Sequence, residues 1–139
     1  MILSLTRLRL GRWRDLPKFL EMSRLCVEQA AADASCCGGA SYAGPGLCFW
    51  TATLWRDEAS LRSYLGSGAH REAMPLLAQW CTEAAVAHFG GDRLPEKSEI
   101  AALLGPRAKF STVRAPSPLQ QSKVLSPRAP WFRNVFKKP

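Results

Sequence analysis

Several patterns that carry well-known chemistry are missing from this sequence of 139 residues. No P-loop, nucleophile elbow or G-x-G-x-x-G occurs, so hydrolase and nucleotide-dependent functions lack residues to carry them. With two histidines and no C-x-x-C pair, a multi-histidine metal site within one chain is excluded and a zinc site has no support. No apolar run approaches the roughly 20 residues that span a bilayer. We therefore predict neither a metal site nor a membrane span.

The cysteines and the first residues bear on the compartment. Five cysteines cannot all pair within one chain. Arg7 and Arg9 interrupt the segment that a signal peptide would keep apolar, so we expect no export signal. In a reducing compartment thiols stay free. We therefore expect a cytoplasmic protein whose cysteines serve as small buried side chains.

Positive charge is confined to one end of the sequence. The net charge is +8, yet residues 1–105 contain 11 basic and 11 acidic residues, which cancel. Residues 106–139, which we call the basic tail, contain 8 basic residues and no acid. We therefore divide the chain into a domain over residues 1–105 and a basic, proline-rich tail, extended or docked on a partner.

Hydrophobic periods along residues 1–105 predict an α+β fold. Strict alternation predicts a strand over 2–10, helical spacing a helix over 16–32, and four glycines a short bulged strand within 35–46. There follow a strand over 47–56, a helix capped by Asp57, a helix over 69–80, a strand over 81–89 and a helix over 95–104. This order is a ferredoxin-like split βαβ with a four-stranded antiparallel sheet and helices on one face.

The strand over 47–56 is apolar on both faces, which indicates that both faces of the sheet are covered. By period two, Trp50 and Trp55 point to opposite faces. One of them packs under the helices, and the other is available to line an interface or a pocket. Helices cover one face, so we expect a second copy of the chain to cover the other.

The stretch "FWTATLWRDEASLRSYLGSGAHREAM", residues 49–74, resembles the dimeric α/β-barrel superfamily, in a branch related to spheroidene monooxygenase and antibiotic-biosynthesis monooxygenases. The match extends over residues 47–89, is loose over 2–32 and is absent from the tail. The resemblance implies a homodimer whose sheets close face to face, with a hydrophobic small molecule bound near a sheet. Some relatives bind haem, and others oxygenate polycyclic aromatics without a cofactor.

Two histidines and two tryptophans are the candidate site residues. His70, at a helix start, has its imidazole pKa lowered by the helix dipole, and a neutral imidazole can act as a base or ligate haem iron. The alternative is a histidine that closes the preceding chain break. His88, Trp50 and Trp55 are candidates for substrate contact, with core packing as the alternative.

The end of the tail, "PWFRNVFKKP", combines large apolar residues with positive charge. On a single helical turn, Trp131, Phe132 and Phe136 would share a face beside Arg133, which predicts anchors for an acidic protein or an anionic membrane surface. Alternatively, the anchors fold back on the chain's own domain, or the tail is disordered. No nucleic-acid-reading motif accompanies the charge, so a nucleic-acid partner is a minor alternative.

Two functions from different classes follow. The first is a monooxygenase-like enzyme that binds a hydrophobic small molecule, with His70 as the catalytic residue. The second is a non-catalytic binding or scaffold protein that docks through its tail. The sequence offers no pair of carboxylates placed as an acid and a base, so the first hypothesis depends on His70.

Overall fold

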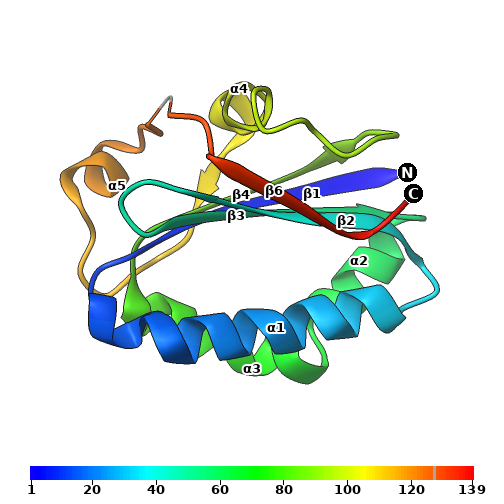
Figure 1. Ribbon diagram of the computed structural model, residues 1–139, viewed down its shortest axis with the longest axis horizontal. Coiled ribbons are helices and arrows are strands. Elements are labelled where there is room, and N and C mark those ends of the chain that lie inside the picture. The colour runs from blue at the N-terminus through cyan, green and yellow to red at the C-terminus, as the bar shows by residue number, and fades with distance from the viewer. Residues whose placement is uncertain (127) are drawn as a thin grey trace.

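The central sheet has the ferredoxin-like strand order that the sequence predicts. In the computed structural model, which describes residues 1–126 and 128–139, the main elements are β1 (Ile2–Leu10), α1 (Leu16–Ala32), β2 (Cys36–Gly44), β3 (Cys48–Trp55), α2 (Glu58–Leu65), α3 (Gly68–Trp80) and β4 (Cys81–Gly90). β1 lies between β3 and β4 and is antiparallel to both. Figure 1 shows α1, α2 and α3 together on one face of the sheet. The α+β ferredoxin-like class is therefore confirmed.

The predicted number of four strands is wrong, because the tail adds a strand at each edge of the sheet. β5 (Lys109–Phe110) pairs with β4, and β6 (Phe132–Lys137) pairs with β2, giving the order β5-β4-β1-β3-β2-β6. Edge strands expose unpaired N–H and C=O groups; β6 pairs with residues 39–43 of β2, and β5 pairs with Ala85 and Val86 of β4. The helical turn predicted for the aromatic end of the tail is also wrong, since these residues form β6 (Figure 1).

The glycines that obscured β2 in the sequence make room for the end of the chain. A Cβ atom at Gly39 would collide with the ring of Phe136, and one at Gly44 would lie 3.2 Å from Pro130. β2 is a strand of 9 residues, longer than predicted, and its register shifts at Cys36/Gly38 and Gly39/Ala40 agree with the predicted bulge. Its small residues allow β6 to lie directly beside it.

Local signals set the helices. The Asp57 side chain accepts a hydrogen bond from the Ser60 amide at 2.8 Å and so caps α2. α3 runs through Pro75 for 13 residues, beginning at Gly68 with a φ of +56°. In the described residues, no helix has the length and apolar character needed to cross a membrane.

The second face of the sheet is covered by the chain itself. Leu94 and the short helix α4 (Ile100–Leu104) pack on apolar side chains of β1, β2, β3 and β4. Ile100 and Leu104 are 0% exposed. Figure 1 shows α4 on the side of the sheet opposite α1. The sequence is right that this face is covered, but its cover does not require a second copy, and the dimer through this face stays a prediction.

The middle of the tail is held against β4. α5 (Pro118–Ser122) places Gln120 so that its side chain accepts from the Ala84 amide at 3.1 Å and donates to the Ser111 carbonyl at 2.7 Å. The Ser117 amide donates to the Thr82 carbonyl at 3.0 Å. Of the arrangements that the sequence left open, the structure has the tail folded back on the domain.

Candidate functional site

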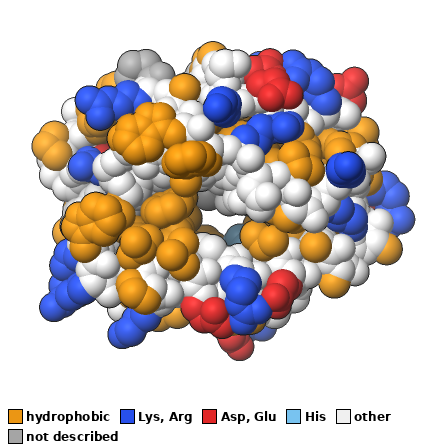
Figure 2. All heavy atoms as spheres, viewed as in Figure 1, with side chains coloured by type: hydrophobic (Ala, Val, Ile, Leu, Met, Phe, Trp, Pro, Cys, Tyr) orange, Lys and Arg blue, Asp and Glu red, His pale blue; other side chains and the backbone are white. Residues whose placement is uncertain are grey.

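A cavity of about 460 Å³ lies between the helix-covered face of the sheet and helices α1 and α3. Strands β1, β2, β3 and β6 provide its floor and rim, so the tail contributes to it. Figure 2 shows the hollow near the middle of the molecule, with hydrophobic side chains gathered around its mouth. The sheet and the helix layer therefore enclose a space large enough for a small organic molecule.

The floor of the cavity carries a row of polar side chains. In the strand register, Thr6 lies opposite Thr51, Thr51 opposite Ser41, and Ser41 opposite Asn134. Directly opposed residues of antiparallel strands point to the same face, so this row crosses β1, β3, β2 and β6. Hydroxyl groups donate and accept hydrogen bonds. The row therefore offers a line of contacts to the oxygen atoms of a ligand.

Aromatic and aliphatic side chains form the walls. Phe19 of α1 packs on Phe49 of β3 with ring centroids 4.9 Å apart. Phe132 and Phe136 of β6 also line the cavity, and Phe132 is 68% exposed. Apolar walls above a polar floor fit a flat hydrophobic molecule with a few oxygen substituents.

His70 lies in the cavity lining, in the first turn of α3. Its Nδ1 is 3.1 Å from the Leu65 carbonyl oxygen, which can only accept, so the neutral ring carries its hydrogen on Nδ1. Burial lowers the pKa of His70, and the hydrogen bond to Leu65 only partly opposes this effect. Nε2 is therefore the unprotonated nitrogen, able to accept a proton.

Two neighbours hold His70 in place, Gln29 at its backbone amide and Tyr64 at its ring. Gln29 of α1 accepts a hydrogen bond from the His70 amide at 2.9 Å and donates to the Ser67 carbonyl at 3.0 Å. Tyr64 packs against the His70 ring with centroids 5.0 Å apart. His70 thus closes the end of α2, as the alternative interpretation holds, and also faces the cavity.

The other predicted site residues are spread over the fold. Trp55 is 0% exposed and stacks on Tyr64 at 4.7 Å, one layer behind His70. Trp50 is 2% exposed and belongs to the core that α4 covers, and it also contributes to the cavity lining. His88 is exposed on β4, in the register position opposite Ser4. The structure brings His70 together with Phe132 and Phe136 of the tail, and the binding roles of all these residues stay predictions.

Sequence analysis missed the hydroxyl row and Tyr64. The row has a visible signal, because threonine or serine recurs every second residue in otherwise apolar strands, at positions 4 and 6 and again at 51 and 53. The register that aligns Thr6, Thr51 and Ser41 depends on long-range pairing, which the sequence pattern does not contain.

The fold of this chain is similar to that of several solved ferredoxin-like structures, one of which is named an antibiotic biosynthesis monooxygenase. A solved structure named antibiotic biosynthesis monooxygenase has a TM-score of 0.59 at 16% identity and covers 68% of this chain and 100% of its own. The structure of Rv0793 from Mycobacterium tuberculosis has a TM-score of 0.60 at 13% identity and covers 68% of this chain and 98% of its own. A conserved protein from Methanosarcina mazei Go1 has a TM-score of 0.58 at 17% identity and covers 66% of this chain and 92% of its own.

At such identities the likeness is one of fold. No protein-family model and no curated protein matches the chain. The neighbours cover about two thirds of it, which is the size of the part from β1 to β4. The suspected resemblance is thereby confirmed at the level of the fold.

Proposed function

We propose that this protein binds a hydrophobic small molecule with oxygen substituents in the cavity and oxygenates it as a monooxygenase. The observation that carries the proposal is that His70, whose Nδ1 faces the Leu65 carbonyl and leaves Nε2 as its basic nitrogen, lines the same cavity as the hydroxyl row of Thr6, Thr51 and Ser41. The monooxygenase name of a structural neighbour supports the same reaction class. In the proposed reaction the substrate itself supplies the electrons that reduce O₂.

The reaction would begin with proton transfer. His70 Nε2 takes a proton from an acidic CH₂ group of the substrate. The resulting carbanion reduces O₂ and forms a C–O bond with it. One oxygen atom forms a C=O bond in place of the two C–H bonds, and the other leaves as water with both hydrogens. The hydroxyl row would bind and stabilise the oxygen atoms of the anion, whose charge grows as the proton leaves.

Haem, the other option that the resemblance implies, fits these residues poorly. The cavity lining contains two arginines, and both are engaged: Arg24 with Glu21 and Glu28, and Arg133 with the Pro95 carbonyl at 3.1 Å. The propionates of haem would therefore lack free counter-charges. The polar floor is also a poor match for the apolar face of a porphyrin.

His70→Gln is expected to lower the oxygenation rate of anthrone, a tricyclic ketone with an acidic CH₂, by about 10²–10⁴-fold. Glutamine keeps a hydrogen bond to Leu65 possible but removes the base. In the unsubstituted protein the rate should fall as pH drops through the pKa of His70, which burial holds below the ordinary 6.5. Oxygen uptake with anthrone as the only reductant measures both effects.

Two further variants separate binding from chemistry. Thr51→Val removes a hydroxyl from the row and should raise the dissociation constant for anthrone by about 2–10-fold, whereas the exposed Thr112→Val should not. After haem is added, the unsubstituted protein and His70→Gln should have the same absorption in the Soret region, because His70 does not ligate haem. Uptake of oxygen at the same rate with His70→Gln would contradict the proposed role of His70.

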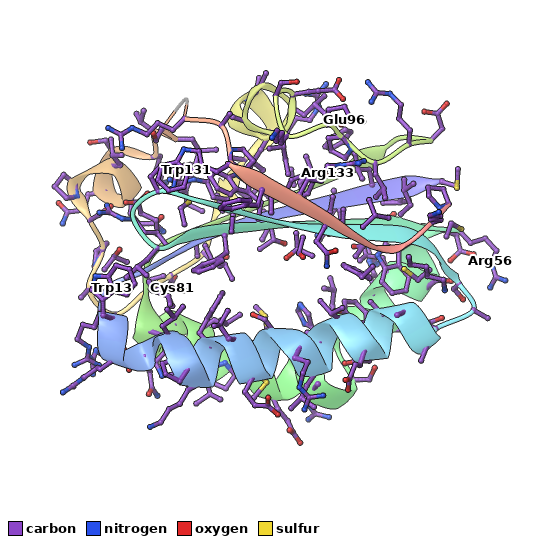
Figure 3. All side chains as sticks on the ribbon, in the orientation of Figure 1. Trp13, Arg56, Cys81, Glu96, Trp131 and Arg133 are labelled. Atoms are coloured by element: carbon purple, nitrogen blue, oxygen red, sulfur yellow. The ribbon has the colours of Figure 1, made fainter. Side chains whose placement is uncertain are left out.

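A second function, docking through the tail, is favoured by the exposure of its aromatic end. Trp131 is 60% exposed and Phe132 is 68% exposed, although both lie in or beside β6. Figure 3 labels Trp131 and Arg133, which lie two residues apart where β6 begins. Exposed aromatic side chains close to positive charge suit an anionic membrane surface, from which an apolar ligand could also reach the cavity mouth. An acidic protein is the other candidate partner.

We expect Trp131→Ala/Phe132→Ala to remove most of the binding to phosphatidylserine-containing vesicles, because the aromatic rings supply the apolar contact. Co-sedimentation with these vesicles, and with vesicles of phosphatidylcholine alone, measures it. Trp13→Ala is the matched control, since Trp13 is 72% exposed but lies outside the tail. Equal loss in both variants would argue against a specific role of the tail.

A further inference from the structure

A second pocket, with a lining separate from that of the His70 cavity, occurs where three parts of the chain meet. Arg12 and Arg14 lie in the turn that precedes α1 and Lys18 in the first turn of α1, whereas Trp80 ends α3 and Arg114 belongs to the tail. Its volume is about 410 Å³, and it shares no lining residue with the His70 cavity. We call it the basic pocket.

Backbone hydrogen bonds fix the frame of the basic pocket. The Gly11 amide donates to the Trp80 carbonyl at 2.9 Å, which joins the end of β1 to the end of α3. The Arg114 amide donates to the Ala78 carbonyl at 3.0 Å, which holds the tail against the same helix. The cationic side chains therefore start from fixed backbone positions rather than from a free tail.

The charges of the basic pocket do not balance. Four cationic side chains face one carboxylate, that of Asp15, and Asp15 already accepts from Arg12 Nε at 3.2 Å. Within residues 1–126 and 128–139, Arg14, Lys18 and Arg114 form no ion pair. Like charges around one concave space repel each other, and α1 adds the positive end of its dipole. A bound anion would relieve this repulsion.

We propose that the basic pocket binds a phosphate-bearing small molecule. Phosphate carries about −1.5 to −2 charges at pH 7, which suits three unpaired cations better than a single carboxylate does. Guanidinium groups bind phosphate oxygens through two parallel hydrogen bonds, and a lysine adds a mobile point charge. The indole of Trp80 in the pocket wall offers a face for a flat part of the same ligand.

The cations of the basic pocket can be distinguished from the other positive charges on the surface by where they lie. Figure 2 shows Lys and Arg side chains on the left of the view, where Figure 1 places the beginning of α1. Other cations, such as Arg71 on α3, are exposed but do not line this pocket. A comparison at equal charge can therefore distinguish a site from a general positive field.

The test is a calorimetric titration of the full chain with pyrophosphate at low ionic strength. Arg14→Gln/Arg114→Gln should weaken binding by about tenfold or more, because hydrogen bonds between two charged groups are lost. Arg71→Gln/Lys138→Gln removes the same charge outside the pocket and should change the dissociation constant by less than about twofold. All of the substituted arginines and lysines are exposed, so both variants are expected to fold.

Two readouts decide the proposal. In the nitrogen–proton spectrum, the indole signal of Trp80 should shift on adding pyrophosphate and should stop shifting in Arg14→Gln/Arg114→Gln. Equal weakening by both double variants would show a diffuse field and overturn the proposal. Binding of a DNA oligonucleotide without binding of pyrophosphate would overturn it as well, in favour of a polyanionic partner.

Discussion

Replacing Glu83 with glutamine is expected to lower the free energy of unfolding by about 3–5 kcal/mol. Glu83 is 2% exposed, and its carboxylate accepts from Arg7 Nη1 at 2.7 Å, Arg9 Nη1 at 2.9 Å and Ser117 Oγ at 2.9 Å. Arg7 is itself only 5% exposed. Glutamine would leave the buried Arg7 guanidinium without an anion and would loosen the tail at Ser117. Urea denaturation followed by circular dichroism measures the change.

Paired controls separate the buried charge from simple loss of contacts. Arg7→Met/Glu83→Leu removes both charges and should recover most of the stability, because an apolar pair of similar volume avoids desolvation of ions. Arg24→Gln breaks the exposed ion pairs with Glu21 and Glu28 and should change stability little. A loss in Glu83→Gln as small as that in Arg24→Gln would contradict the argument.

The same residue gives stability a definite pH dependence. Burial by itself would raise the pKa of Glu83, but the hydrogen bonds from Arg7, Arg9 and Ser117 hold it below the ordinary value of 4.5. A carboxyl whose pKa is lower in the folded state contributes its full stabilisation above the pKa of the unfolded state. That contribution is then lost as pH falls through the folded-state pKa. The difference between the unsubstituted protein and Glu83→Gln should therefore shrink below pH 4.5.

The order of β1 to β4 could be predicted because its signals are local. Alternation in 2–10, helical spacing in 16–32 and the Asp57 cap each depend on residues close together in sequence, and the structure has these elements. The apolar character of both faces of β3 also correctly indicated a covered sheet. It could not indicate what covers it, because apolar surface attracts any apolar partner.

The role of the tail could not be predicted, because it depends on pairing over long distances. Ala40 faces Val135 in the register between β2 and β6, nearly a hundred residues apart. Local spacing of Trp131, Phe132 and Phe136 fits a helical turn equally well. The glycines of β2 acquire their meaning only when Phe136 lies above Gly39. For the same reason, the sequence could identify His70 from its own position, but it could not predict that Phe132 lines the same cavity.

The cover of the second sheet face leads to an expected result for oligomeric state. Ile100→Ala/Leu104→Ala removes the two side chains by which α4 fills that face, each 0% exposed. Each truncation of a buried aliphatic residue is expected to cost about 2–5 kcal/mol. The loosened segment would then expose the apolar side chains Leu3, Leu5 and Leu54, on the face where a second copy was predicted to bind.

We therefore propose that a dimer through this face forms only when α4 and its flanking residues are displaced. Light scattering after gel filtration should give the full chain the mass of one protomer. Ile100→Ala/Leu104→Ala should shift to twice that mass as the protein concentration rises. Leu119→Ala, at a position 37% exposed in α5, is the control and should leave the mass unchanged. A dimer of the full chain that Leu3→Asp does not weaken would point to another interface. A dimer that Ile100→Ala/Leu104→Ala abolishes would show that α4 builds the interface instead of blocking it, because its side chains would then be contacts between protomers.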